Sequence, residues 1–208
     1  TYGGGLYLYT GSAQIVGNWF QANSGSSQGA GLWLHATALV ANNVVLDNVG
    51  HGLYLDSALS TSRDDSDVLN NTIVDSTGYG VFLDYFYSSS TYYYATSDFV
   101  NNIVYSSGSY DVYVYGSSSR AFSDLTWQDN DVYGGSGYSA YNQTGTNGNV
   151  SQNPNFTDEG AEDFSLAWPS AYCIDAGQST ASYGVTTDID GTARPRGLAY
   201  DIGAYESY

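Results

Sequence analysis

A three-residue phrase, aliphatic–aromatic–aliphatic, recurs five times in this chain of 208 residues. Its copies read LYL at residues 6–8, LWL at 32–34, LYL at 53–55, VFL at 81–83 and VYV at 112–114. Successive copies begin 26, 21, 28 and 31 residues apart. Repeats of this length predict a solenoid, and short alternating strands within them predict a β-solenoid. Equivalent side chains on successive coils must then stack into columns.

A second phrase begins with asparagine and recurs with nearly the same period. Its copies start at Asn43, Asn71, Asn102 and Asn130, with a fainter copy at Asn18. Each coil is therefore predicted to carry at least two short strands, separated by corners rich in Gly, Ser and Asn. Because stacked strands lie about 4.8 Å apart, we expect these asparagines to stack at a corner and to hydrogen-bond one another. Asparagine also tolerates the left-handed backbone that such corners need.

The charge of the chain limits its partners. Its formal net charge is −17, from 21 acidic and 4 basic residues, which excludes nucleic acid as an expected partner and argues against adsorption to anionic membranes. No apolar run is long enough to predict insertion into a membrane. The same charge permits a cation such as Ca²⁺ to bind, and the sequence predicts no other cofactor. The single cysteine, Cys173, has apolar neighbours and is predicted to be a buried thiol.

The repeats occupy residues 1–145, which predicts five to six turns. Residues 146–208 differ in chemistry, because all three prolines, at positions 154, 169 and 195, lie there. We expect this segment to be a transition followed by a C-terminal cap of the same domain. A cap is needed because the last coil of a solenoid exposes unpaired backbone groups and an open apolar core.

Four segments of this tail carry a resemblance to a known family: DFSL at residues 163–166, SAYCIDAG at 170–177, DIDGTARP at 188–195 and DIGAYE at 201–206. Together they resemble the end of secreted microbial right-handed parallel β-helix proteins, which have a pectate-lyase-like fold. The resemblance implies an all-β, single-stranded right-handed parallel β-helix in an extracellular or cell-surface setting. It implies no particular reaction. The chain opens within a strand phrase, so we also expect a processed or partial product.

Two further features of the tail are interpreted as structural. Asp188, Asp190 and Gly191 have the start of a calcium-loop pattern, but no glutamate follows at the required distance. We therefore expect a turn held by Asx hydrogen bonds. Arg194 and Arg196 face a strongly acidic chain and are predicted to form ion pairs that fasten the tail.

The middle residue of each triplet should point away from the coil, because side chains alternate along a strand. Three interpretations of this outward aromatic column stay open: cross-strand stabilisation worth about 0.2–1 kcal/mol per pair, a sugar-binding platform, or an interface with another copy of the chain. The column consists of Tyr7, Trp33, Tyr54, Phe82 and Tyr113, and two positions further on the same face carries Tyr9, His35, Asp56, Asp84 and Tyr115.

Asp56 and Asp84 would lie one coil apart, with His35 beside them. Two close carboxylates raise one pKa, as an acid/base pair requires, and retaining glycosidases hold theirs about 5–5.5 Å apart. The alternative is a solvated acidic strip or a weak cation site. A lyase is disfavoured, because the resemblance implies a calcium cluster with an Arg or Lys base. The only basic residues of the repeat region, Arg63 and Arg120, sit outside the columns.

Two functions follow as hypotheses. The first is an extracellular structural or adhesive protein, in which an open first turn pairs with another copy and head-to-tail contacts propagate into a filament. Its partners would be other copies of itself or cell-surface components. The alternative is a carbohydrate-binding or polysaccharide-degrading protein, a hydrolase if it is an enzyme at all.

Overall fold

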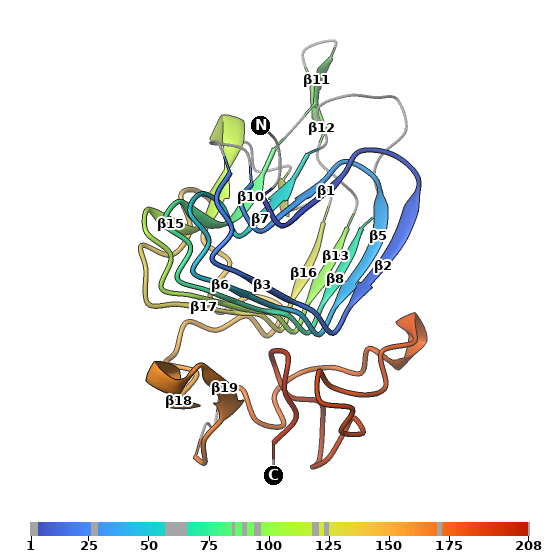
Figure 1. Cartoon of the computed structure of the whole chain (residues 1–208), viewed down its shortest axis with the longest axis vertical. Helices are drawn as coiled ribbons and strands as arrows, with labels where there is room; N and C mark the ends of the chain where they lie inside the picture. Colours follow the sequence, from blue (N-terminus) through green and yellow to red (C-terminus); the bar gives the residue numbers. More distant parts are fainter. Residues whose placement is uncertain are drawn as a thin grey trace.

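The computed structural model describes residues 4–25, 29–56, 66–84, 86–88, 91–93, 97–117, 121–122, 125–169 and 172–207. Its described part is an all-β coil in which each turn contributes one strand to each of three parallel, five-stranded sheets (Figure 1). The predicted fold class is therefore confirmed: the chain is a parallel β-solenoid.

The three sheets follow one another around the coil. Sheet A is built from β1 (Leu6–Leu8), β4 (Leu32–Leu34), β7 (Leu53–Leu55), β10 (Tyr79–Leu83) and β15 (Tyr110–Val114). Sheet B is built from β2 (Ser12–Val16), β5 (Thr37–Ala41), β8 (Asp67–Leu69), β13 (Asp98–Val100) and β16 (Thr126–Gln128). Sheet C is built from β3 (Trp19–Gln21), β6 (Val44–Leu46), β9 (Thr72–Val74), β14 (Ile103–Tyr105) and β17 (Asp131–Tyr133).

Shorter elements lie outside these sheets. Two antiparallel pairs join β11 (Phe86–Ser88) to β12 (Thr91–Tyr93) and β18 (Phe156–Asp158) to β19 (Asp163–Leu166). Three single turns of 3₁₀-helix are η1 (Tyr115–Ser117), η2 (Glu159–Ala161) and η3 (Ala181–Tyr183). Among the described residues, no helix has the length and hydrophobicity needed to cross a membrane.

The flanking aliphatic residues of the triplets fill the inside of the coil, as the alternation predicts. Leu32, Leu53 and Val81 lie in register on adjacent strands and are at most 1% exposed. A glycine precedes four of the five triplets, and it reflects how closely the coils approach there. A Cβ added at Gly31 would lie 2.3 Å from the carbonyl oxygen of Gly52, closer than any real side chain can come.

The predicted asparagine ladder is present at the corner between sheets B and C. Asn43 donates to the Oδ1 of Asn71 through its backbone N–H at 3.0 Å and through its Nδ2 at 2.9 Å. The same pair of bonds repeats along Asn18, Asn43, Asn71, Asn102, Asn130 and Asn149. The left-handed residue of each corner immediately precedes the ladder residue, as at Asn42, Asn70, Asn101 and Asp129.

The tail, orange to red in Figure 1, lies beside the coil against the outer face of sheet C. Outward residues of that sheet, including Val44, Val74 and Ile103, form one apolar cluster with Phe164 and Ile202 of the tail. We expected this segment over the last coil, but burying an exposed apolar sheet face is the stronger driving force.

The last coil is bonded instead by residues 137–150. Val112 and Tyr138 form one parallel bridge, and Asp131 and Val150 form another. The Trp127 indole also donates a hydrogen bond to the Tyr138 hydroxyl at 3.0 Å. Residues 137–150, of which those up to 145 were expected to belong to the repeats, therefore cover part of the end of the coil.

Candidate functional site

The aromatic column lies on the outer face of sheet A, and its rings stack on one another. Tyr7 and Trp33 have ring centroids 4.4 Å apart, and Tyr54 and Phe82 are 4.5 Å apart with planes only 10° from parallel. Trp33–Tyr54 and Phe82–Tyr113 continue the column at 6.2 and 5.1 Å. The ring faces therefore lie largely against other rings rather than toward solvent.

The centre of this column is buried, contrary to the expectation of a solvent-facing ladder. Tyr7 is 42% exposed, but Trp33 is 2% and Tyr54 is 3% exposed. One cause is that the backbone at Gly29 passes over them: a Cβ added there would lie 3.2 Å from the Cβ of Trp33. A second row, with His51 stacked on Tyr79 at 4.8 Å, covers the column from the side.

Sequence reasoning missed this second row, and strict alternation gives no signal for it. His51, Tyr79 and Tyr110 each stand three residues before the middle residue of a triplet, so alternation alone would place them on the opposite face. Tyr79 stacks on Tyr113 at 4.3 Å and thereby joins the two rows.

The structure brings the three candidate catalytic residues together. His35, Asp56 and Asp84 occupy equivalent positions on successive coils. Backbone hydrogen bonds keep them in register: Asp56 N donates to Leu34 O at 2.8 Å, and Asp84 N donates to Leu55 O at 3.0 Å. His35 Nδ1 lies 3.9 Å from Asp56 Oδ1 and 3.0 Å from the Asp56 carbonyl oxygen. We call the row of Tyr9, His35, Asp56, Asp84 and Tyr115 the acidic strip.

Tyr54 is hydrogen-bonded to one carboxylate of the strip and is affected by the charge of the other. The Tyr54 hydroxyl donates a hydrogen bond to Asp84 Oδ2. Burial raises the pKa of Tyr54 well above its usual value, and the hydrogen bond to Asp84 and the charges of Asp84 and Asp56 raise it further. Asp56 and His35 are each 8% exposed, whereas Tyr9 and Tyr115 at the two ends are about half exposed, 47% and 48%.

This arrangement suits proton transfer. An imidazole next to a carboxylate can carry a proton, and a carboxylate held by a phenol keeps a fixed position. Within the described ranges, no three His, Cys, Asp or Glu side chains are grouped as a metal site would require. Arg63 and Arg120, the only bases considered for lyase chemistry, lie outside the described residues.

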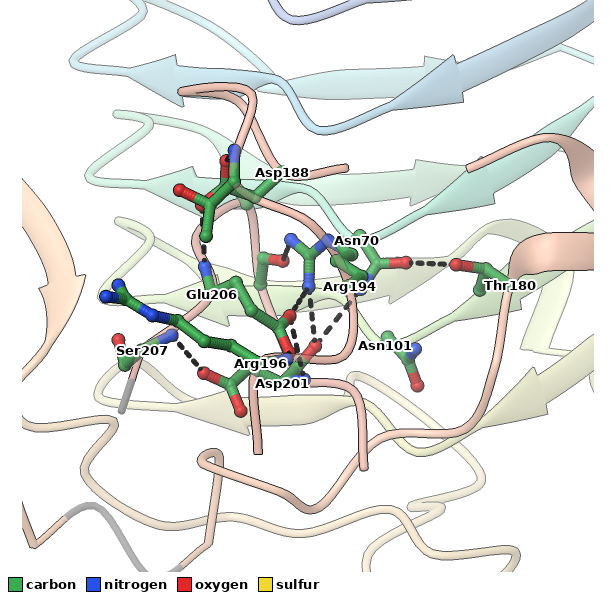
Figure 2. Close-up of polar contacts among 12 residues, drawn as sticks. Asn70, Asn101, Thr180, Asp188, Arg194, Arg196, Asp201, Glu206 and Ser207 are labelled. Atoms are coloured by element: carbon green, nitrogen blue, oxygen red, sulfur yellow. Dashed lines mark hydrogen bonds and ion pairs between the residues drawn. The ribbon is translucent and has the colours of Figure 1, made fainter. Parts of the chain in front are cut away.

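A second polar cluster, shown in Figure 2, holds the tail against the coil. Arg194 Nη1 donates to Glu206 Oε2 at 2.6 Å, and both side chains are fully buried. The predicted ion pair of Arg194 is thus confirmed. The backbone N–H of Arg196 donates to Glu206 Oε1 at 3.0 Å. Asp188 Oδ1 accepts from Asp190 N at 2.9 Å, which is the predicted Asx turn.

The left-handed corner residues of the coil also bind the tail, and we call these contacts and the polar cluster of Figure 2 together the tail clamp. Asn42 Nδ2 donates to Thr187 O at 2.7 Å, Asn70 Nδ2 to Asp201 O at 3.1 Å, and Asn101 Nδ2 to Gln178 O at 2.7 Å. Three coils thus bind the tail backbone with the same side-chain group. The cluster fixes the tail and offers no substrate position.

Cys173 lies in the apolar cluster between the tail and sheet C and is completely buried, as predicted. Its thiol donates to Asp131 Oδ2 at 3.3 Å. Burial raises the pKa of Asp131 to about 6, against the lowering effect of a hydrogen bond from Gln152 N. This pair joins the tail to β17.

Comparison with known proteins agrees with this architecture. Residues 1–119 match the sequence model of a family described as the right handed beta helix region. The chain belongs to this right-handed β-helix family. No curated protein and no solved structure matches the chain. Because the family match ends at residue 119, the resemblance of the β-helix tail to secreted microbial relatives stays a prediction.

Proposed function

We propose that this β-helix protein is an extracellular structural or adhesive protein whose coil serves as a rigid rod. The observation that carries this proposal is the aromatic column, in which stacked and largely buried rings tie successive coils together. Each aromatic pair contributes about 0.5–1.5 kcal/mol beyond its area burial. The asparagine ladder and the tail clamp add hydrogen bonds along the same axis.

The location is tested by antibody labelling of intact cells that produce the protein naturally. Labelling of intact cells equal to that of permeabilised cells supports an outer-surface role. Labelling that requires permeabilisation would contradict it. Washing the labelled cells with high salt then separates electrostatic adhesion from tighter attachment, because the screening length falls from about 8 Å at physiological ionic strength to about 3 Å at 1 M salt.

Head-to-tail assembly into a filament remains part of the proposal, but one end of the coil is already partly hydrogen-bonded by the chain's own residues. Backbone groups of β15 and β17 are hydrogen-bonded by residues 137–150, for example Val112 N to Gly137 O at 3.0 Å and Val132 N to Val150 O at 3.2 Å. A second copy pairing with these two strands must displace that segment. Negative-stain microscopy across a concentration series tests this: fibres support head-to-tail assembly, and monodisperse particles at every concentration argue against it.

A second candidate function is hydrolysis of a polysaccharide along the acidic strip. It is favoured by the contact of His35 with Asp56 and by the hydrogen bond that fixes Asp84. One carboxyl group would protonate the glycosidic oxygen and the other would act as nucleophile or base. The exposed rings of Tyr9 and Tyr115 would contact sugar units on either side.

Release of reducing sugar from a panel of polysaccharides tests this candidate. Asp84→Asn and Asp56→Asn should each lower the rate at least a hundredfold with the fold retained. The matched control is Asp47→Asn, which removes the same charge at an exposed corner where asparagine is conformationally suited. Equal rates for all three variants would exclude the strip as the active site.

A further inference from the structure

Sheet B carries a groove on its outer face that is separate from the acidic strip. A hollow of about 350 Å³ lies over β2 and β5 and is lined in part by Ser12, Gln14, Thr37 and Asp67. A second hollow of about 210 Å³ shares Gln14 and Leu39 with it and extends to residues 183–187 of the tail. The two adjoin, and we call them the sheet B groove.

The tail builds one wall of this groove and holds it in place. Thr180 Oγ1 donates to Asn70 Oδ1 at 2.9 Å, and Asn42 Nδ2 donates to Thr187 O at 2.7 Å. The Tyr183 hydroxyl donates to Asp98 Oδ2 on β13. Because the loop is bonded to three different coils, the wall is formed before any ligand arrives, which lowers the entropic cost of binding.

We propose that the sheet B groove binds a short, uncharged saccharide. Ser12, Gln14 and Thr37 are exposed on the strands, and their hydroxyl and amide groups both donate and accept hydrogen bonds, as sugar hydroxyls require. Leu39 supplies an apolar surface for the C–H face of a sugar ring. The volume falls in the range of about 300–1,000 Å³ that is typical of small-molecule sites.

Charge and geometry exclude two other classes of ligand. Asp67 and Asp98 lie on adjacent strands next to the groove, since Val68 and Phe99 are paired in register. Together with a chain charge of −17 they repel a polyanion such as a polyuronate. A peptide that adds as a further strand would bind along the edge of β2, the last strand of sheet B, and not in the groove, which lies on the face of the sheet.

The test is calorimetric titration of the whole chain with uncharged tetrasaccharides: cellotetraose, mannotetraose and laminaritetraose, with tetragalacturonate as the charged comparison. Thr37→Tyr fills the groove from an exposed strand position where aromatic residues are well tolerated. It should weaken binding at least tenfold. Thr37→Val and Gln14→Ala each remove hydrogen-bonding groups and should weaken binding about two- to tenfold.

Asp47→Asn is the matched control, because Asp47 is exposed and lines neither hollow. Its affinity should equal that of the unmodified chain, with thermal melting verifying the fold of every variant. Asp84→Asn alters the acidic strip and shows whether the saccharide binds there instead. No binding of any uncharged tetrasaccharide would overturn the inference, as would stronger binding of tetragalacturonate. Binding that Asp84→Asn abolishes and Thr37→Tyr leaves intact would also overturn it and would assign the saccharide to the strip. The proposed structural role stands independently of all these outcomes.

Discussion

Asn71 offers the sharpest test of how the coil is held together. It is 1% exposed. Its Nδ2 donates to Val40 O and to Asn102 Oδ1, both at 2.9 Å, and its Oδ1 accepts from the N and Nδ2 of Asn43 at 3.0 and 2.9 Å. In Asn71→Ala the Asn43 Nδ2 keeps its bond to Ile15 O, but the Asn43 N–H loses its side-chain acceptor.

The magnitude follows from these bonds. A buried donor left without a partner costs about 1–3 kcal/mol, and the remaining lost hydrogen bonds add about 1–2 kcal/mol. We therefore expect Asn71→Ala to lower the free energy of unfolding by about 2–5 kcal/mol. Asn18→Ala removes the same side chain at the exposed end of the ladder. It should cost less than about 1 kcal/mol, because water replaces its partners.

Urea unfolding followed by circular dichroism measures both variants, with the midpoint giving the stability change if the slope stays constant. A loss below about 1 kcal/mol for Asn71→Ala would refute the reasoning, because the ladder would then be replaceable by water or by backbone shifts. Equal losses for Asn71→Ala and Asn18→Ala would refute it too, since burial could not then be the cause.

Two further predictions concern buried charge in and beside the tail. Burial raises the pKa of Asp131 to about 6, whereas an aspartate in an unfolded chain has a pKa of about 3.9. The folded state therefore favours the protonated carboxyl group, and the free energy of unfolding falls as the pH rises from about 4 to 6. Asp131→Asn should therefore gain about 1–3 kcal/mol at pH 7.5 and little near pH 4 in guanidinium titrations, with exposed Asp47→Asn as a control of equal charge change. Arg194→Met should cost about 3–5 kcal/mol, because it leaves the Glu206 carboxylate buried without its partner. Glu206→Gln, which keeps an oxygen acceptor for the guanidinium, should cost less by thermal melting, and equal losses would contradict the ion-pair explanation.

The strongest predictions from sequence came from residues that the stacking makes repetitive. Leu32, Leu53 and Val81 had to recur because each packs on its equivalent in the next coil. The ladder asparagines had to recur because each bonds the next one, as Asn43 does Asn71. A contact that repeats on every coil requires the same residue type at a regular spacing, so the coil and its asparagine corner could be predicted from the sequence.

Sheet B escaped prediction because its strands share alternation but no constant residue. Its segments read SAQIV, TALVA, DVL, DFV and TWQ, and their inward positions range from Ala38 to Trp127. The volume that each coil needs there differs, since Phe99 and Trp127 stack at 4.2 Å while earlier coils use smaller residues. Burial of Trp33 and the position of the tail depend on contacts between distant segments, which no local pattern encodes.

The three outer faces of the coil explain where a function can lie. The outer face of sheet C is apolar and is covered by the tail. The outer face of sheet A is aromatic and covers itself by stacking, so its most exposed described side chains are the end rings Tyr7, Tyr9 and Tyr115. The outer face of sheet B is partly polar, at Ser12, Gln14 and Thr37, and partly apolar, where Ala41, Leu69 and Val100 pack against Val185 of the tail. Because the inside of the described coils is filled by core side chains, a ligand or partner of this part of the chain has to bind on its outside. Side chains such as Thr37 and Gln14, which contribute nothing to the core, are therefore the positions where recognition can change without loss of the fold.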